Sequence, residues 1–467
     1  MEQIGGSIGA LFTAVFDQAL SRKYPVLNSN RSNLLRCVSA LWLIGGAAIV
    51  SGHGHVRDVA TLHQFWVGIG VMAVGFILSW RLRSLSVLWF WGVAIATRLL
   101  LLPMEPGDDV WRYLWEGHIQ NLGFSPYHFA PNAPELALYR PDWWSQINHP
   151  DVSAIYPPIT ELGFRWLAAI APNLYLFKLA FTLADLLVCG LLCRRFGHAQ
   201  ATLYAWNPMI IYAFAGGAHY DSWFILPLVA AWLLADYEPD CEPSERRFTW
   251  FWSALCVGIS VAVKWMSLPM VGFLIWRSLR QLKFWQAGWI GLASTLPIVL
   301  SALPFCQTSA CPLMPTQSVF MSYGRSAEFI PHFVAQVWQP SLQTNAIYLF
   351  PLALFTIWLT VRANSFQQFA EWYWFGLLTL TPIVHFWYFT WMVPFAVPSQ
   401  NWGVRLVSLS AFVYFVLPAR IPDWRLTAVE RLLLWLPLML GWLWTTWQSS
   451  QKNRKLASNS GRIKSKS

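Results

Sequence analysis

The sequence contains few charged residues and lacks two common signatures of nucleotide-binding domains. Only 12% of its 467 residues are Asp, Glu, Lys or Arg, about half the share that soluble globular proteins carry. It has neither the Gly-x-x-x-x-Gly-Lys-Ser/Thr phosphate-binding loop nor the Gly-x-Gly-x-x-Gly dinucleotide fingerprint. These absences argue against a soluble enzyme and against chemistry that depends on a nucleotide held in such a domain.

Cysteine is also scarce and irregularly spaced. The seven Cys residues show no metal-ligand spacing, and only Cys306 and Cys311 share a loop. Those two could form a disulfide or remain free thiols. Residues 1–30 lack a continuous apolar core, so we expect no cleavable signal peptide. The formal net charge of +10 comes from basic residues scattered among short polar gaps and the chain end, which argues against nucleic-acid binding.

Hydrophobic residues, in contrast, make up 56% of the chain, and the mean hydropathy is +0.42. The 31 Trp and 15 Tyr residues suit the aromatic belts of the two bilayer interfaces. A helix needs about 20 apolar residues to cross a bilayer, so the sequence predicts an all-α polytopic bundle of about 12 to 14 transmembrane spans. The interpretation with the most spans places them at 34–51, 63–80, 85–103, 173–193, 200–215, 222–236, 249–264, 266–276, 285–303, 346–361, 370–384, 386–399, 404–418 and 430–447.

Lys and Arg residues in the short loops set the expected orientation. Arg31 and Arg36 place the N-terminus in the cytosol. The apolar stretch 158–172 would put Arg194 and Arg195 outside if it crossed the membrane, so we expect it to lie at the outer interface. The predicted organisation is a cytosolic segment 1–33, a transmembrane domain 34–447 with exofacial loops 104–172 and 304–345, and a basic cytosolic tail 448–467.

Two adjacent carboxylates, Asp108 and Asp109, follow a Pro-Gly turn at the start of the first long loop. Carboxylates at the edge of a membrane are costly unless a cation meets them, which suggests a function. They could act as a general base toward an acceptor hydroxyl, or bind a divalent cation such as Mg²⁺ or Mn²⁺. They could also cap the helix that begins there, and this structural role is compatible with the other two.

Three cations are expected near the outer leaflet, on the side of the carboxylates. Arg98 and Lys264 lie near the outer ends of their spans, and Lys178 lies five residues into a span that starts outside. A lipid-linked phosphate needs cations at headgroup depth. The alternative for each is that the long side chain reaches water from a helix end. Asp185 follows Lys178 by about two helical turns and more plausibly packs between helices.

Two further segments reach the same surface. Gly216 to Asp221 brings His219 and Asp221, which could hold a metal ion or a sugar hydroxyl, or could form an ordinary polar turn. The aromatic segment His385 to Trp391 could stack on sugar rings or anchor the helices at the interface. Tyr156, in a Pro-stiffened part of the first loop, could point into a cavity or pack.

The order of motifs resembles a known family. In sequence these are Asp108-Asp109-x-x-Arg112-Tyr113-x-Trp115-Glu116-Gly117, Gly123-x-x-Pro126-Tyr127-x-x-Ala130-Pro131, Asn148-His149-Pro150 and Ile155-Tyr156-Pro157-Pro158. They resemble the first-loop signature of GT-C glycosyltransferases, in particular bacterial mannosyltransferase-like members that use polyprenyl-phosphate sugars. Later landmarks of this resemblance are Asn207-Pro208, Gly216 to Asp221, Lys264, and His385-x-Trp387-Tyr388-x-x-Trp391-x-x-Pro394.

The resemblance implies a GT-C fold, an active site at the outer membrane face, a lipid-phosphate sugar donor and inversion of the anomeric centre. The acidic residue of the first loop would correspond to Asp108 or Asp109 and would be the catalytic base or a metal ligand. We expect the substrate-binding residues to be Arg98, Arg112, Tyr113, Glu116, Tyr127, Tyr156, Lys178, His219, Asp221, Lys264, His385 and Tyr388.

These observations predict a multi-pass glycosyltransferase of a bacterial plasma membrane. It would move a sugar, mannose by preference, from a polyprenyl-phosphate donor to a glycan or lipid acceptor on the non-cytosolic face. No cofactor other than a divalent cation is indicated. The alternatives are a transporter or flippase of a lipid-linked sugar, which would place its charges nearer the middle of the bilayer, and a noncatalytic subunit, in which both aspartates could be replaced without loss.

Overall fold

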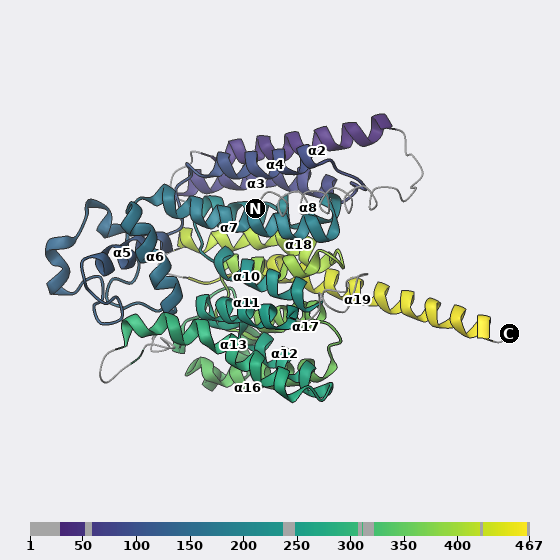
Figure 1. Ribbon diagram of the computed structural model, residues 1–467. Helices are drawn as coiled ribbons and strands as arrows, with labels where there is room; N and C mark the ends of the chain where they lie inside the picture. Colours follow the sequence, from purple (N-terminus) through teal and green to yellow (C-terminus); the bar gives the residue numbers. More distant parts are fainter. Residues whose placement is uncertain are drawn as a thin grey trace, which may run out of the picture.

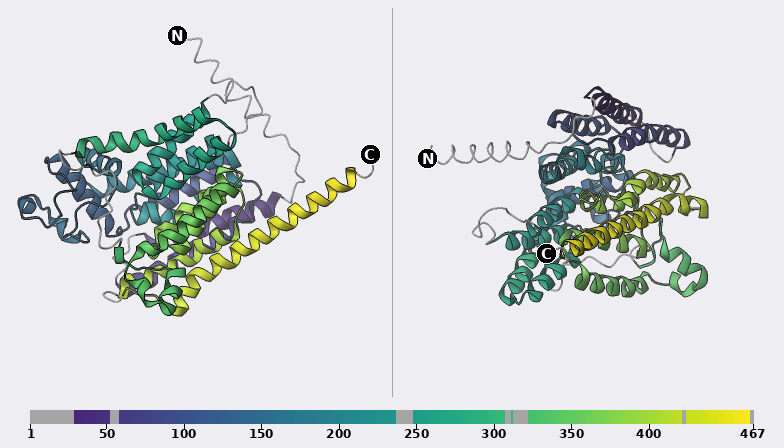
Figure 2. Two further views of the ribbon diagram at one scale, coloured as in Figure 1. Left: turned by 90° about the horizontal axis from the view of Figure 1, so that it is seen from below. Right: turned by 90° about the vertical axis from the view of Figure 1, so that its right-hand side faces the viewer.

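The computed structural model describes residues 29–51, 58–236, 248–306, 311, 322–420 and 424–464. Within these residues the chain forms helices and turns and no β-strand, which confirms the predicted all-α fold. Most helices lie alongside one another in a single bundle (Figures 1 and 2). Residues 1–28 and 465–467, which the sequence assigns to the two cytosolic ends, lie outside this description.

The α-helices have the following bounds in chain order. They are α2 (Ser29–Val50), α3 (Val59–Ser79), α4 (Val87–Leu101), α5 (Asp109–Asn121), α6 (Pro158–Ile170), α7 (Leu174–Phe196), α8 (His198–Ala205), α9 (Pro208–Ile211), α10 (Ser222–Ala235), α11 (Thr249–Val263), α12 (Leu268–Arg280), α13 (Phe284–Ala302), α15 (Ile330–Val337), α16 (Leu349–Arg362), α17 (Phe366–Leu380), α18 (Trp402–Ser410) and α19 (Ala428–Lys464). The short helices are η1 (Pro134–Tyr139), η2 (Asp142–Gln146), the π-turn η3 (Tyr212–Gly216), η4 (Trp265–Ser267), η5 (Leu303–Phe305), η6 (Gln339–Leu342), η7 (Asn345–Tyr348), η8 (Phe386–Met392), η9 (Pro394–Ala396), η10 (Ala411–Val416) and η11 (Pro418–Arg420).

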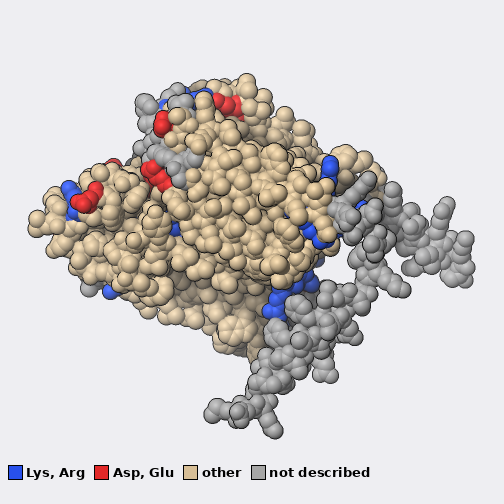
Figure 3. All heavy atoms as spheres, turned by 90° about the horizontal axis from the view of Figure 1, so that it is seen from above, with Lys and Arg blue, Asp and Glu red and all other residues tan. Residues whose placement is uncertain are grey.

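Six helical stretches in the described residues are long and apolar enough to cross a bilayer, and three shorter apolar helices accompany them. In Figure 3, the centre of the visible face carries no charged side chains, and Lys and Arg gather toward the end where α19 leaves the bundle. The protein is therefore an integral membrane protein, as expected. The exact number of spans stays a prediction. The six stretches are Ser32–Val50, Ala60–Ser79, Leu174–Phe196, Phe284–Phe305, Asn345–Arg362 and Trp402–Arg420.

Two of the predicted spans are wrong as continuous helices. The segment 200–215 breaks at Asn207-Pro208 into α8, α9 and η3, because Pro208 has no backbone N–H to continue α8. Asn207 restarts the helix: its side chain accepts from the backbone N–H of Met209 (3.0 Å) and donates to Ser408 (2.7 Å). The segment 386–399 contains the 3₁₀ helices η8 and η9 instead of a transmembrane α-helix. The short predicted spans 249–264 and 266–276 leave room for a broken helix at Trp265, and η4 does separate α11 from α12 there.

The first loop is an ordered lobe at one end of the bundle, and α19 leaves from the opposite end (Figure 1). Helix α5 packs directly on α6: a Cβ added to Gly117 would lie 2.3 Å from the carbonyl oxygen of Phe164. Trp115, Ile119, Leu136 and Ile147 form a separate small core inside the lobe. The apolar stretch expected at the outer interface is therefore α6, which stabilises the lobe by packing.

The second long loop contains a disulfide. Cys306 and Cys311 are bonded, which resolves the choice between a disulfide and two thiols. Residues 307–310 and 312–321 of this loop lie outside the described part of the chain.

Helix α19 continues without interruption from Ala428 to Lys464, so it runs beyond the predicted boundary at residue 447 and most of the tail extends this helix.

Candidate active site

Two segments that are far apart in the sequence meet at the start of the first loop. The backbone N–H of Gly107 donates to the carbonyl oxygen of Gly217 (3.0 Å). A Cβ at Gly107 would lie 3.2 Å from that oxygen and 3.6 Å from the His219 ring. This close backbone contact brings Asp109 Oδ2 to 3.8 Å from His219 Nδ1. The Pro-Gly turn therefore joins the acidic pair to the segment between η3 and α10.

Asp108 occupies the N-cap position of α5, and Asp109 is the first residue of that helix. The side chain of Asp108 makes no capping hydrogen bond, so capping alone does not account for the acidic pair. Asp109 Oδ1 accepts a hydrogen bond from Asn148 Nδ2 (2.8 Å). Its side chain is 21% exposed, which leaves the carboxylate accessible to a substrate.

The pKa of Asp109 is raised to about 7. The main cause is burial, which penalises the charged carboxylate, and the neighbouring charge of Asp108 adds to it. The hydrogen bond from Asn148 and the charge of Lys264 act in the opposite direction. A carboxyl with a pKa near neutrality is well suited to accept a proton at physiological pH.

A second acidic group, Asp221, is paired with Lys264 beside the first. Lys264 follows the last residue of α11, where the helix breaks, and its Nζ lies 2.6 Å from Asp221 Oδ1. Trp391 Nε1 donates to the same oxygen (2.7 Å). Asp221 is 1% exposed and Lys264 is 16% exposed, so the lysine is the member of the pair that a substrate can reach.

Aromatic rings surround the Lys264 ammonium. Its Nζ lies 4.7 Å from the ring centre of Trp391 and 5.1 Å from that of Tyr388, and these two rings stack on each other. Tyr220 and Phe224 lie slightly farther away, at 5.2 and 5.7 Å. Such cation–π contacts stabilise the ammonium without neutralising it. The ammonium is thereby fixed in position beside Asp221, and its exposed part can meet an anionic ligand.

The two histidines of the site are held by Trp387. Its ring centre lies 3.7 Å from that of His219 and 4.6 Å from that of His385, with the rings nearly parallel. His385 Nδ1 lies 2.7 Å from the Tyr414 hydroxyl. Burial lowers the pKa of His219 well below its usual value, so the imidazole is neutral at pH 7 and its contact with Asp109 is not an ion pair.

Two buried polar atoms of this site have no hydrogen-bond partner within the described part of the chain. They are Nδ1 of His219 and Oδ2 of Asp221. Leaving a buried polar atom unpaired costs about 1–3 kcal/mol. Such atoms also occur elsewhere in the described part of the chain, so these two support a substrate site only together with the charged groups around them. Both atoms could instead bind the hydroxyl groups of a substrate.

Arg112 and Glu116 lie beneath the site rather than in it. Arg112 Nε donates to Glu116 (2.7 Å), and its remaining donors reach the carbonyl oxygens of His149, Val152 and Ser153 at 2.6–3.2 Å. This loop directly follows Asn148. The contacts therefore favour a supporting role, in which Arg112 holds Asn148 against Asp109, over direct substrate binding.

Three of the candidate tyrosines form a wall next to the acidic pair. Tyr113 is buried and stacks on Phe164 with 4.7 Å between ring centres. The Tyr127 hydroxyl donates to the carbonyl oxygen of Tyr156 (2.7 Å). Tyr156 in turn packs edge-on against Tyr220, which precedes Asp221. Packing dominates the contacts of all three, and Tyr127 and Tyr156 stay partly exposed.

Arg98 and Lys178 do not join the site. Arg98 Nε pairs with Asp185 (2.5 Å), and its Nη1 donates to the carbonyl oxygens of Ala94 and Ala205. Lys178 Nζ donates to the carbonyl oxygens of Met104 (2.6 Å) and Leu101 (3.4 Å). Both side chains are buried. Their donors are engaged within the protein, so the structure favours Lys264 as the phosphate ligand among the three predicted cations.

The Arg98–Asp185 pair yields a stability prediction. We expect Arg98→Met to destabilise the protein by about 3–5 kcal/mol, because it leaves Asp185 as an unpaired buried charge. Thermal unfolding in detergent would measure this loss. The double variant Arg98→Met/Asp185→Leu should lose less than the single variant, since neither charge then remains. A single variant as stable as the parent would contradict a structural role for the pair.

A divalent cation would have few ligands in this arrangement. Among the described residues, no group of three or more His, Cys, Asp or Glu side chains is placed to hold a metal ion. Asp108 and Asp109 remain the residues that could bind one, together with a phosphate of the substrate.

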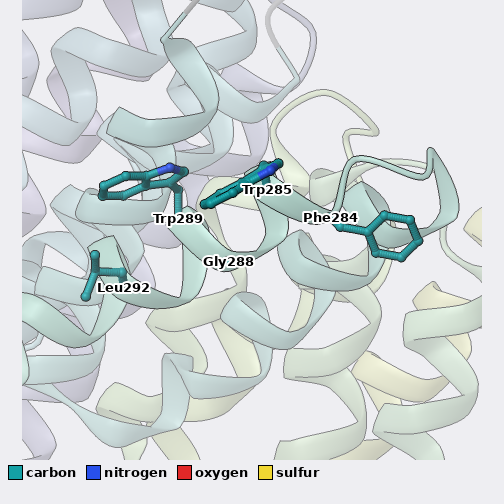
Figure 4. Close-up of a pocket in the computed structure, with 5 residues that line it drawn as sticks. All are labelled: Phe284, Trp285, Gly288, Trp289 and Leu292. Atoms are coloured by element: carbon teal, nitrogen blue, oxygen red, sulfur yellow. The ribbon is translucent and has the colours of Figure 1, made fainter.

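One surface hollow lies away from these residues. It is a shallow apolar groove along one face of α13, lined by Phe284, Trp285, Gly288, Trp289 and Leu292 (Figure 4). Trp285 is 84% exposed and lies two residues after Lys283, as expected of an aromatic residue at a bilayer interface. This groove suits lipid contact and lacks the polar groups of a catalytic site.

Sequence reasoning missed several residues of the site. Asn148 was assigned no role although it belongs to a quoted motif, and Trp387 and Trp391 were considered only as part of the aromatic segment His385 to Trp391. Tyr414 lies beyond those motifs, and no sequence signal pointed to its contact with His385. Of the predicted residues, the structure brings together Asp109, His219, Asp221, Lys264, His385 and Tyr388, next to Asp108.

A comparison with protein families gives a match. The family model described as "Alpha-(1->6)-mannopyranosyltransferase, N-terminal domain" matches residues 26–280, which is more than half of the chain. The matched range includes the acidic pair, Asn148, Asp221 and Lys264. Comparisons with curated proteins and with solved structures give no match.

Proposed function

The chain belongs to the alpha-(1->6)-mannopyranosyltransferase family, and on this premise we propose that it transfers mannose from a polyprenyl-phosphate donor to a glycan or lipid acceptor. The proposal includes a GT-C type of architecture and inversion at the sugar C1. One observation carries it: an accessible carboxylate with a pKa of about 7 lies beside a fixed, partly exposed lysine at one end of a transmembrane bundle.

In the proposed reaction, Asp109 removes the proton from the acceptor hydroxyl. The acceptor oxygen then forms a bond to the mannose C1 while the bond from C1 to the donor phosphate oxygen breaks. Polyprenyl phosphate leaves with the electron pair of that bond, and Lys264 offsets its negative charge. Because the oxygen attacks from the side opposite the phosphate, the configuration at C1 inverts. Tyr388 and Trp391 offer apolar faces for the sugar ring.

The site is expected to face away from the cytosol. Basic residues of the short loops favour this orientation, and the Cys306–Cys311 disulfide supports it, since disulfides persist in oxidising compartments. A donor embedded in the membrane also fits a site at the bundle end. The placement of the charged groups at that end, beside the first-loop lobe, favours a transferase over a flippase, whose site would lie near the middle of the bilayer.

The test of this function is transfer from a defined donor. Purified protein should move radiolabelled mannose from polyprenyl-phosphate mannose to an oligomannoside or lipid-linked mannoside. GDP-mannose alone should give no product, because the proposed donor is the lipid-linked sugar. Absence of turnover with folded protein and a panel of such acceptors would count against the assignment.

The pKa of Asp109 predicts the pH dependence of the reaction. A base must be deprotonated, so kcat/KM should rise with pH and level off above about pH 7, instead of near pH 4 as for an unshifted aspartate. Asn148→Ala removes a hydrogen bond that lowers this pKa, so the midpoint should move to higher pH. A rate profile that stays flat from pH 8 to pH 5 would exclude Asp109 as the titrating base.

A further inference from the structure

A polar pocket lies at the end of the bundle opposite the acidic pair. It has a volume of about 280 Å³, close to the smaller small-molecule sites of ~300 Å³. Helix α10 connects the two ends, because it begins next to Asp221 and ends next to Asp236 in the pocket wall. Its 14 residues separate the two places by about 21 Å. The pocket is thus distinct from the proposed active site.

The pocket is formed where several helices end. Arg195 comes from the last turn of α7, Arg277 from the last turn of α12, and Asp236 follows α10. The residues that line it are Arg195, Phe196, Trp232, Leu233, Asp236, Arg277, Asn364, Ser365, Gln367 and Pro398. The lining of this cavity thus contains two guanidinium groups and one carboxylate.

The carboxylate is occupied by other contacts. Asp236 accepts hydrogen bonds from Arg277 Nη1 (2.9 Å) and from the backbone N–H groups of Phe366 (3.1 Å) and Gln367 (3.0 Å). These bonds cap the first turn of α17 and fix Arg277 in place. Arg277 Nη1 also donates to the carbonyl oxygen of Ala235 (3.2 Å). These bonds of Arg277 use Nη1, and its side chain is 37% exposed, so the guanidinium can bind an additional acceptor.

Arg195 has no acidic partner in the described part of the chain. Its guanidinium lies over the ring of Phe196, with 5.8 Å to the ring centre. Phe196 stacks on Trp232 with 5.4 Å between ring centres, which gives the pocket an apolar wall beside its basic rim. A guanidinium is the side-chain group best suited to bind phosphate through paired N–H donors.

We propose that this pocket binds a phosphate group, supplied by the headgroup of an anionic membrane lipid. The guanidinium groups of Arg195 and Arg277 would hold the phosphate oxygens, and Phe196 and Trp232 would contact the glycerol and the start of the acyl chains. Basic pockets between transmembrane helix ends bind anionic headgroups in this way. The site lies in the leaflet opposite the acidic pair and is independent of the transfer reaction.

The test uses full-length protein in nanodiscs of phosphatidylcholine with increasing fractions of phosphatidylglycerol. Bound phosphatidylglycerol, counted by native mass spectrometry, should saturate at one tightly held molecule. Arg195→Gln should weaken its binding about fivefold, the amount expected for one basic residue at a membrane surface, and Arg195→Lys should retain part of it. The matched control is Arg83→Gln, which removes the same charge from an exposed residue after α3, outside the pocket.

A second arm identifies the source of the phosphate. Inorganic phosphate is titrated against the protein in phosphatidylcholine nanodiscs, with thermal unfolding as the readout. A saturable rise of the unfolding temperature that Arg195→Gln weakens would extend the site to free phosphate, whereas a response to phosphatidylglycerol alone would restrict it to a headgroup. Equal losses in Arg195→Gln and Arg83→Gln, or no preference for phosphatidylglycerol over phosphatidylcholine, would overturn the proposal.

Discussion

Asp109→Asn is expected to lower kcat by about 10²–10⁴-fold, the usual contribution of a general base. The amide has the same shape as the carboxylate and can still accept the hydrogen bond from Asn148, so the local structure should persist. The variant loses the ability to take the proton of the acceptor hydroxyl. Single-turnover transfer from radiolabelled polyprenyl-phosphate mannose would measure the effect on the chemical step, with donor binding measured separately.

Asp108→Asn is the matched control for this prediction. It removes a carboxylate one residue away, and with it a charge that raises the pKa of Asp109. We therefore expect Asp108→Asn to retain most of kcat and to shift the acid limb of the rate profile toward lower pH. The opposite result, with Asp108→Asn inactive and Asp109→Asn active, would transfer the role of base to Asp108.

The fold could be predicted from the sequence where a run of apolar residues was long and unbroken. Helices α2, α3, α7 and α13 lie close to their predicted spans, because about 20 apolar residues leave little choice. The segments 200–215 and 386–399 are equally apolar but are not single helices. Pro208 and Pro394 each begin a new short helix there, and neighbouring helices bury the irregular backbone. The average hydropathy of a segment does not reveal whether neighbouring helices will bury its irregular backbone.

For the candidate site, the sequence could predict only how deep each side chain lies in the membrane, because that depth follows from its position along a helix. Lys264, His219 and His385 lie at helix ends on one side of the bundle, so their assembly near Asp109 followed from that pattern. Arg98 and Lys178 were placed at a similar depth, but depth does not reveal which neighbour a side chain meets. Asp185 and the carbonyl oxygen of Met104 engage them instead. These partners come from tertiary packing, which a single sequence does not encode in any local pattern.

Lys264→Met is expected to impair both stability and transfer. Asp221 is 1% exposed, so removing its cation leaves an uncompensated buried charge that costs about 3–5 kcal/mol. If Lys264 also binds the leaving phosphate, transfer should fall by a further 10–100-fold, because a charge-assisted hydrogen bond contributes about 1.5–3 kcal/mol. Thermal unfolding and turnover of the folded fraction would measure the two effects separately.

The double variant Lys264→Met/Asp221→Asn separates the structural role of the lysine from its catalytic role. It removes both charges, and the amide oxygen that replaces the carboxylate can still accept the hydrogen bond that Trp391 donates to Asp221, so most of the lost stability should return. Transfer should stay low, since no cation then faces the donor phosphate. Lys264→Arg keeps a charge and should retain part of the activity. If the double variant regained full turnover, Lys264 would serve only to neutralise Asp221, and the leaving phosphate would need another ligand.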